Sequence, residues 1–251
     1  MNVAILIAAR MKSTRLPKKC MAMIEDQPLI SHLIDRMKLV DNASHVILCT
    51  SDDEDDTVLV EQAIKKDIAY VQGSKENVLD RFMLAADMVN ADIIVRVTGD
   101  NPLTCPKYIE RAITKHIEGG YDYTSTTKMP QGTKGEIINV NALKKAHELA
   151  QNPEFSEYMT WYFTKNPEHF VIGEGPVIEN MVRPNYRLTV DHAEDLTLIR
   201  VLYNKFRVNG STPDLQEVVQ YLDEHPELLS INGSVPKLQI SSEVNVKLNL
   251  H

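Results

Sequence analysis

The first twenty residues of the chain combine a short apolar run with a dense group of positive charges. Residues 3–9 (VAILIAA) are apolar throughout, and five cations follow within ten residues: Arg10, Lys12, Arg15, Lys18 and Lys19. An apolar run of this length predicts a strand buried in a parallel sheet. In open sheets, ligands bind at the carboxyl ends of such strands. Because Arg and Lys donate to phosphate oxygens, the loop is typical of a polyphosphate site.

The front half of the chain alternates apolar strands with amphipathic helices. We expect strands at residues 3–9, 44–50, 68–72 and 91–97. We expect helices at residues 30–39, 56–65, 77–89 and 106–118. Helices of about ten residues between strands are typical of βαβ units. The chain is therefore predicted to be an α/β protein, with a mostly parallel sheet and helices on both faces.

The character of the sequence changes after Gly119 and Gly120. Residues 121–140 mix Thr, Ser, Gly, Pro and β-branched residues, which predicts antiparallel strands and loops. Later segments predict helices at 141–150, 193–205 and 213–224, a strand at 182–190, and a strand or loose tail at 234–251. With no repeat or linker in view, we expect one domain over residues 1–251, with an inserted lobe at about 120–185.

Composition and charge exclude several classes of protein. The formal net charge is -8, from 27 Lys and Arg against 35 Asp and Glu, so nucleic acid is not an expected partner. Cys20, Cys49 and Cys105 are too widely spaced for a disulfide framework or a metal motif. No apolar run approaches the roughly 18 residues of a membrane helix, and no basic leader precedes the N-terminal run. We expect a cytoplasmic protein without a membrane partner.

Two further segments place a carboxylate at the end of an expected strand. Residues 95–100 (VRVTGD) bring Asp100 to the same sheet edge as the cationic loop. A carboxylate beside a triphosphate suits Mg²⁺, which binds one or two carboxylates plus substrate phosphates. Residues 187–191 (RLTVD) bring Asp191 to a similar position. The alternative for both carboxylates is a capping role at the start of a turn or helix. For Asp191, the local sequence taken alone favours this capping role.

A helix near residue 80 carries an amide and a guanidinium. Within residues 72–82 (QGSKENVLDRF), Asn77 and Arg81 are four apart and share one helical face. They are suited to contact a base or a phosphate, or else Ser74 or Asn77 caps the helix and Arg81 lies at the surface. The acidic run of residues 52–56 (DDEDD) favours a helix N-terminus, with a position of Asp52 near a nucleotide as the alternative.

Taken together, these motifs resemble the sugar cytidylyltransferases. The resemblance is carried by residues 7–19 (IAARMKSTRLPKK), 72–82, the Gly-Asp-x-Pro element at 99–102, and 187–195 (RLTVDHAED). The nearest branch is the spore-coat-polysaccharide type, with the CMP-Kdo (3-deoxy-manno-octulosonate) and CMP-sialate synthetases further off. Lys18 departs from the family pattern, because many members have Gly there. The resemblance covers about residues 3–205 and implies a Rossmann-like nucleotidyltransferase fold, commonly dimeric.

The resemblance implies a role for each motif. Arg10, Arg15 and Lys19 would hold the triphosphate of CTP, and the backbone near Ala8 and Ala9 would meet the base. Asp100 and Asp191 would bind Mg²⁺, which reverses the capping interpretation of Asp191. Catalysis is expected from Arg10, Lys19 and Asp100. The nucleotide-binding residues expected are Ala8, Ala9, Arg10, Arg15, Lys19, Asp52, Asn77 and Arg81.

The implied reaction joins CTP to a sugar acid, Kdo-like or nonulosonic, giving a CMP-sugar and pyrophosphate for surface polysaccharide. Acceptor contacts are expected around residues 123–125 and 130–132, in a lobe that also forms a homodimer; Tyr158 departs from the family. The alternatives are another base, a phosphorylated or phosphonate acceptor, or a non-catalytic nucleotide-binding relative. A nucleotide-sugar-dependent glycosyltransferase is a further alternative, with residues 53–55 (DED) as its metal element.

Overall fold

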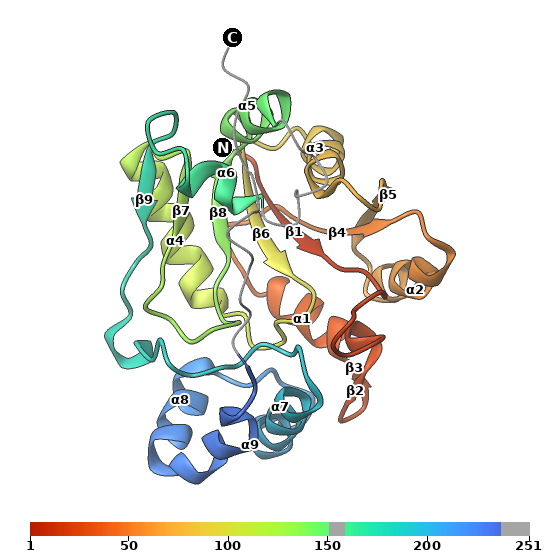
Figure 1. Cartoon of the computed structure of the whole chain (residues 1–251), viewed down its shortest axis with the longest axis vertical. Coiled ribbons are helices and arrows are strands. Elements are labelled where there is room, and N and C mark those ends of the chain that lie inside the picture. Colours follow the sequence, from red (N-terminus) through yellow and green to blue (C-terminus); the bar gives the residue numbers. More distant parts are fainter. Residues whose placement is uncertain (151–158, 237–251) are drawn as a thin grey trace.

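A seven-stranded sheet forms the centre of the computed structural model, which describes residues 1–150 and 159–236 (Figure 1). The strands lie in the order β5 (Ala69–Gly73), β4 (His45–Ser51), β1 (Val3–Ala8), β6 (Ile93–Thr98), β8 (Glu136–Asn139), β7 (Tyr123–Ser125) and β9 (Ile172–Glu174). β1 therefore has β4 on one side and β6 on the other.

Within this sheet, β8 alone runs opposite to the other strands. β1 pairs in parallel with β4 and β6, β4 with β5, and β7 with β9, whereas β8 is antiparallel to both β6 and β7. Ile7 on β1 lies opposite Leu48 and Val97. Because the parallel strands end at one edge, the segments that follow β1, β4 and β6 meet there, beside the strand where the chain order reverses.

Helices cover both faces of the sheet and define two apolar cores. One core includes side chains of α1 (Leu29–Met37), α2 (Thr57–Lys65), α4 (Pro106–Gly119), α7 (Ala193–Phe206) and α8 (Leu215–Glu224). The other includes side chains of α3 (Val78–Met88), α5 (Val140–Leu149) and α6 (Thr160–Thr164). Ile5 and Ile7 face the first core and Ala4 and Leu6 the second, as alternation along a doubly covered strand requires.

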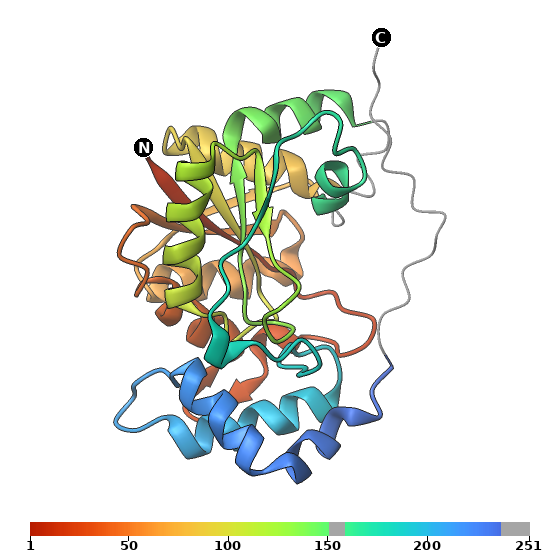
Figure 2. The same cartoon turned by 90° about the vertical axis from the view of Figure 1, so that its left-hand side faces the viewer.

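The last helices lie together at the carboxyl edge of the parallel strands. In Figure 1, α7, α8 and α9 (Ser230–Gly233) gather below the sheet, at the end toward which β6 points, and Figure 2 shows the same layer from the side. The short helical turns are η1 (Lys19–Met21), η2 (Glu54–Asp56), η4 (Glu179–Met181) and η5 (Pro226–Leu229). The C-terminal layer therefore borders the segments that follow β1 and β6.

The predicted α/β class and the eight elements of the front half are confirmed, with bounds within two residues. The strand predicted at 182–190 is wrong, because the described residues there make only an isolated bridge between Gln131 and Arg187. The hairpin of β2 (Met23–Ile24) and β3 (Gln27–Pro28) was not expected, nor was β9. Tyr158 and residues 237–251 of the predicted C-terminal strand or tail lie outside the described residues.

The stretch predicted as an inserted lobe contributes three strands, β7, β8 and β9, to the main sheet. Its antiparallel character is confirmed for β7 and β8, whereas a separate role in acceptor or dimer contact stays a prediction. Among the helices of residues 1–150 and 159–236, none has the length and apolar character needed to cross a membrane.

Candidate active site

A backbone hydrogen bond between Lys18 and Met11 closes the cationic loop that follows β1. The backbone amide of Lys18 donates to the carbonyl of Met11 at 3.2 Å, and the Met11 side chain is 7% exposed. Lys18 has a φ of 59°, in the left-handed region that favours Gly. The backbone conformation therefore explains why glycine suits this position, and Lys18 adopts it with its side chain exposed.

Opposite charges from three distant segments meet at the end of this loop. The Lys19 ammonium donates to Oδ2 of Asp100 at 2.6 Å and to Oδ1 of Asp191 at 2.7 Å. The same Asp191 oxygen accepts from Arg15 at 2.7 Å, and Arg187 donates to Oδ2 of Asp191 at 3.2 Å. Of the predicted catalytic and metal-binding residues, the structure thus joins Lys19, Asp100 and Asp191 directly.

The turn after β6 brings Asp100 close to the end of β1. A Cβ added to Gly99 would lie 2.6 Å from Cβ of Ala9 and 3.2 Å from the carbonyl oxygen of Ala8. Glycine is therefore needed for this close approach of two backbones. The Thr98 hydroxyl donates to Oδ1 of Asp100 at 2.7 Å, which leaves Oδ2 for Lys19.

A second, fully buried carboxylate positions Asp191. Asp195 is 0% exposed, and its Oδ2 accepts from the backbone amides of Asp191 and His192, each at 3.0 Å. Its two oxygens also accept from Arg187 at 2.8 and 2.9 Å, and Oδ1 accepts from the Asn232 amide at 2.9 Å. The start of α7 and the C-terminal helix α9 thus hold the loop that carries Asp191.

Lys19 and Asp191 reinforce each other's charged forms. Burial lowers the pKa of Lys19, but the charges of Asp100 and Asp191 and the hydrogen bonds to them outweigh burial and raise it. Burial likewise raises the pKa of Asp191, but the hydrogen bond from Lys19 and the charges of Lys19, Arg15 and Arg187 lower it overall. Both groups are therefore charged at neutral pH.

The donor set fits Mg²⁺ shared with a substrate phosphate. In the part of the chain that the structure describes, no three His, Cys, Asp or Glu side chains converge as metal ligands. Asp100 and Asp191 provide two carboxylates within hydrogen-bonding distance of one ammonium. Two carboxylates with phosphate oxygens match the preference of Mg²⁺, so the residues that would hold it are these two.

The predicted base-side residues are more dispersed. Ala8 and Ala9 lie at the end of β1, where the Ala9 amide donates to the Cys49 carbonyl at 3.2 Å. Arg10 is half-buried and Asp52 is exposed, with its backbone amide donating to Gly73 at 3.0 Å. Ala8, Ala9 and Arg10 therefore adjoin the charged centre, whereas Asp52 follows the next strand, β4.

The capping interpretation is confirmed for Asn77, whereas the surface position expected with it for Arg81 is wrong. Asn77 is the N-cap of α3, and its Oδ1 accepts from the Asp80 amide at 3.2 Å. Arg81 is not at the surface, because it is 2% exposed and its Nη1 donates to the carbonyls of Ser74 and Lys75. Burial is the main cause that lowers its pKa, with a smaller contribution from the charge of Arg10.

A separate polar cluster lies on β6, β8 and β7, near the residues predicted to contact the acceptor. Arg96 pairs with Oε2 of Glu136 at 2.5 Å, and the Tyr123 hydroxyl donates to Oε1 of Glu136 at 2.8 Å. The Lys134 ammonium donates to the Ser125 hydroxyl at 3.2 Å. This buried pairing of charges was not predicted. The pattern of residues 121–140 indicated strands, but it did not show which strands would be neighbours in the sheet.

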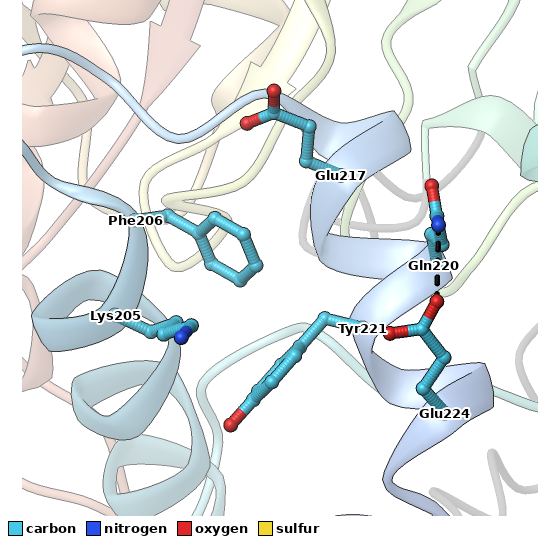
Figure 3. Close-up of a pocket in the computed structure, with 6 residues that line it drawn as sticks. All are labelled: Lys205, Phe206, Glu217, Gln220, Tyr221 and Glu224. Carbon is cyan, nitrogen blue, oxygen red and sulfur yellow. Dashed lines mark hydrogen bonds between the residues drawn. The ribbon is translucent and has the colours of Figure 1, made fainter.

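A hollow of about 320 Å³ lies between α7 and α8, apart from the charged centre (Figure 3). Phe206 and Tyr221 form an edge-to-face pair within it, with ring centroids 5.4 Å apart. The other lining residues are Lys205, Glu217, Gln220 and Glu224. None of the sequence motifs contributes a residue to this hollow, so no role in the predicted chemistry is assigned to it.

Three buried polar residues, Asp56, Asp195 and Asn232, had no predicted role. The acidic run of residues 52–56 is confirmed at a helix start, where Asp53 caps η2 by accepting from the Asp55 amide at 3.3 Å, but no separate role was predicted for Asp56. Asp195 belonged to a recognised motif but had no predicted role. Asn232 lies far from every motif in the sequence, and only its contact with Asp195 reveals its function.

Comparison with known proteins places these features in one family. The family model described as "Cytidylyltransferase" matches residues 4–226. The chain is 32% identical over 233 residues to the spore coat polysaccharide biosynthesis protein SpsF of Bacillus subtilis, covering 90% of this chain and 96% of that protein. It is 30% identical over 173 residues to a 3-deoxy-manno-octulosonate cytidylyltransferase of Geobacter sulfurreducens, covering 68% and 64%.

Solved structures share the same fold. A cytidylyltransferase from Leptospira borgpetersenii superimposes with a TM-score of 0.85 at 26% identity, covering 96% of this chain and 100% of that one. A CMP:2-keto-3-deoxy-manno-octonic acid synthetase complexed with CTP has a TM-score of 0.63 at 17% identity, covering 82% and 99%. At that identity the second structure supports the fold alone.

Proposed function

The chain belongs to the cytidylyltransferase family and is a CTP-dependent nucleotidyltransferase, and from this premise we propose that it transfers CMP from CTP to a sugar acid. The acceptor is a Kdo-like or nonulosonic acid used for surface polysaccharide. Support for this acceptor class comes from what the relatives are called: SpsF is a spore coat polysaccharide biosynthesis protein, and others are 3-deoxy-manno-octulosonate cytidylyltransferases.

The observation that carries the proposal is the position of Lys19 between Asp100 and Asp191. In the reaction, an acceptor hydroxyl oxygen forms a bond to the α-phosphorus of CTP and releases its proton to water. The bond from the α-phosphorus to the bridging oxygen breaks, and pyrophosphate leaves. Arg10, Arg15 and Lys19 stabilise the negative charge on the phosphates, since preorganised donors act on charge that develops in the transition state.

Asp100 and Asp191 are the proposed ligands of Mg²⁺. When bound, the ion supplies positive charge to the phosphates of the nucleotide. In the described structure the Lys19 ammonium donates to both carboxylates, and its third N–H group can donate to a phosphate oxygen of the nucleotide. Ala8, Ala9, Asp52, Asn77 and Arg81 are proposed on the base side of the site.

A glycosyltransferase would need the carboxylates of residues 53–55 for a metal. Oδ2 of Asp53 instead accepts from Lys12 and Lys75, each at 3.0 Å. Cytidylyl transfer also accounts for the cationic loop, which that alternative leaves without a role. The homodimer and the cytoplasmic location stay predictions from the sequence.

The first test measures thermal unfolding with CTP, UTP, ATP and GTP, each with and without Mg²⁺. A ligand at about 100 times its Kd stabilises a protein by roughly 2.7 kcal/mol, so CTP with Mg²⁺ should raise the Tm most. Pyrophosphate release with 3-deoxy-manno-octulosonate and N-acetylneuraminate then identifies the acceptor. A larger shift with another nucleotide would overturn the assignment of the base.

The metal assignment is tested by Asp100→Asn. Because the amide is neutral, the Mg²⁺-dependent part of the CTP shift should disappear, and turnover should fall by about 10²-fold or more. Asp41→Asn, at an exposed position, is the matched control and should keep the full shift. An unchanged Mg²⁺-dependent shift in Asp100→Asn would remove Asp100 from the metal site.

A further inference from the structure

Asp56 is a buried carboxylate with a strong set of hydrogen bonds outside the charged centre. It is 2% exposed, at the end of η2. Oδ2 accepts from the Thr50 hydroxyl at 3.0 Å, and from the Ser51 backbone amide and hydroxyl at 3.1 and 2.5 Å. Oδ1 accepts from the backbone amide of Met11 at 2.6 Å. One carboxylate therefore joins the end of β4 to the loop after β1.

The nature of its partners indicates a positioning role. Among the ion pairs of the described residues, none includes Asp56. A buried carboxylate is expensive unless it is paired or hydrogen-bonded, and here four neutral donors satisfy it. Three of the four donors belong to Thr50 and Ser51 and fix the carboxylate itself. The fourth hydrogen bond holds the backbone amide of Met11 against this fixed carboxylate.

Met11 is the point at which the cationic loop closes. Its amide is held by Asp56, its carbonyl accepts from Lys18, and its side chain is buried in the first apolar core. Arg10 precedes Met11 in the chain, and Lys19 follows Lys18. The two cations that flank the loop therefore both depend on the position of Met11.

A second contact between the same segments is weaker. Lys12 pairs with Asp53 at 3.0 Å, but 57% of the Lys12 side chain is exposed. Exposed ion pairs contribute little. The buried bond from Met11 to Asp56 is therefore stronger than this exposed pair.

We propose that Asp56 is a positioning residue for nucleotide binding: by holding the Met11 amide, it sets Arg10 and Lys19 in place to receive a triphosphate. This inference rests on the proposed function, because it assigns the loop to the phosphates of CTP. It leads to two separate predictions for the loss of Asp56: the loop becomes more mobile, and the affinity for the nucleotide falls.

The first experiment is limited trypsin digestion of Asp56→Asn. Asparagine keeps the size of the side chain, but its NH₂ group replaces one of the two accepting oxygens. Because an NH₂ group cannot accept from the donors around Asp56, at least one of the hydrogen bonds is lost. The loop should loosen, and cleavage after the exposed Arg15 should become about tenfold faster, which corresponds to the lower end of the range for a hydrogen bond to a charged group. Glu54→Gln, an exposed carboxylate in the same turn, should cleave as the wild type does.

The second experiment compares the affinities of CTP and CMP, measured by calorimetry with Mg²⁺. Asp56→Asn should raise the Kd for CTP by about tenfold or more and the Kd for CMP by much less, because CMP lacks the phosphates that the loop holds. Glu54→Gln should leave both values unchanged. A merely structural role of Asp56 would weaken both ligands alike, and that result would overturn the proposal.

The digestion separates this proposal from the proposed function. Faster cleavage after Arg15 with no CTP binding by the wild type would retain Asp56 as the support of the loop and reject the nucleotide. Equal cleavage of Asp56→Asn and Glu54→Gln would overturn the proposal whatever CTP does. If Asp56→Asn does not fold, Ser51→Ala removes one donor to Oδ2. Its cleavage after Arg15 should be faster than that of Glu54→Gln, and an equal rate would overturn the proposal.

Discussion

The charged centre at the ends of β1 and β6 differs from the polar cluster on β6, β8 and β7 in how its charges are paired. In the centre, Lys19 is shared between two carboxylates from distant segments, and 21% of the Asp100 side chain is exposed. In the cluster, Arg96 pairs with Glu136 directly across neighbouring antiparallel strands. Charged side chains that are shared and partly accessible can also bind a ligand. A buried ion pair between neighbouring strands mainly connects those two strands.

The surroundings of the two regions support this distinction. Tyr123, which bonds Glu136, stacks on Phe163 with centroids 5.3 Å apart. The centre instead borders a loop that carries five cations and is held by backbone hydrogen bonds. We therefore expect changes in the cluster to lower the free energy of unfolding, and changes in the centre to lower nucleotide affinity.

The largest effect on stability is expected for Glu136→Gln. It removes the negative charge that pairs with the mostly buried Arg96, which should cost about 3 kcal/mol in the free energy of unfolding, as measured by urea denaturation. The Kd for CTP should change by less than about threefold, which is roughly 0.7 kcal/mol of binding free energy, because Glu136 belongs to the polar cluster and not to the charged centre. Asp223→Asn breaks the exposed pair with Arg183 and should cost less than about 1 kcal/mol. Equal losses in both variants would contradict the comparison.

The largest effect on binding is expected for Lys19→Met. It removes the ammonium shared by Asp100 and Asp191, so two carboxylates would face the phosphates with less compensation. The Kd for CTP should rise by about 100-fold, equivalent to roughly 2.7 kcal/mol, as measured by calorimetry. Lys12→Met removes an exposed cation of the same loop and should change the Kd by less than about threefold. A similar Kd for both variants would show that only the total charge of the loop matters.

The two regions should also respond to acid at different pH. Burial lowers the pKa of His116, next to β7, to about 4, below its usual value of about 6.5. Between these values the unfolded chain binds more protons, so the free energy of unfolding should fall as the pH is lowered from 6.5 to 4. The lowered pKa values of Asp191 and Asp195 stabilise the fold above about pH 4, and this contribution is lost only in stronger acid.

Urea midpoints at pH 7.5, 6.5, 5.5 and 4.5 test this order. His116→Gln removes the buried imidazole that bonds Thr124 and should make the decline between pH 6.5 and 4.5 shallower than in the wild type. An identical decline in both proteins would assign the acid sensitivity to another group.

The smallest effect is expected for Lys18→Gly. Lys18 has a φ of 59°, and glycine adopts this conformation without steric cost, although its greater freedom in the unfolded chain offsets part of the gain. We expect a gain of about 0.5 kcal/mol in the free energy of unfolding, with no loss of CTP affinity. Asp67→Gly, at a φ of 52° away from the site, is the control and should give a similar gain. A loss of CTP affinity in Lys18→Gly alone would give the lysine side chain a direct role.

Errors in the predicted fold have a common physical cause. Residues 182–190 are apolar and β-branched enough to suggest a strand, and Leu188 and Val190 are indeed buried. Burial alone does not require a neighbouring strand, however, and the β-pairing described for this segment is a single bridge between Arg187 and Gln131. The short strand β9 was missed for the opposite reason: Gly173 interrupts any apolar pattern, and pairing with β7 is what makes the segment a strand.

By itself, the sequence determined the α/β class, the front-half elements and the motifs of the charged centre. These follow from local patterns: the periodicity of apolar residues and the polar residues that directly follow each apolar run. The tertiary structure alone decided which polar groups meet: the Lys19 ammonium with Asp100 and Asp191, the Met11 amide with Asp56, and the Asn232 amide with Asp195. These contacts join residues between 37 and 172 positions apart. A side chain's partner at such a separation depends on how helices and strands pack, and no spacing within one segment encodes it.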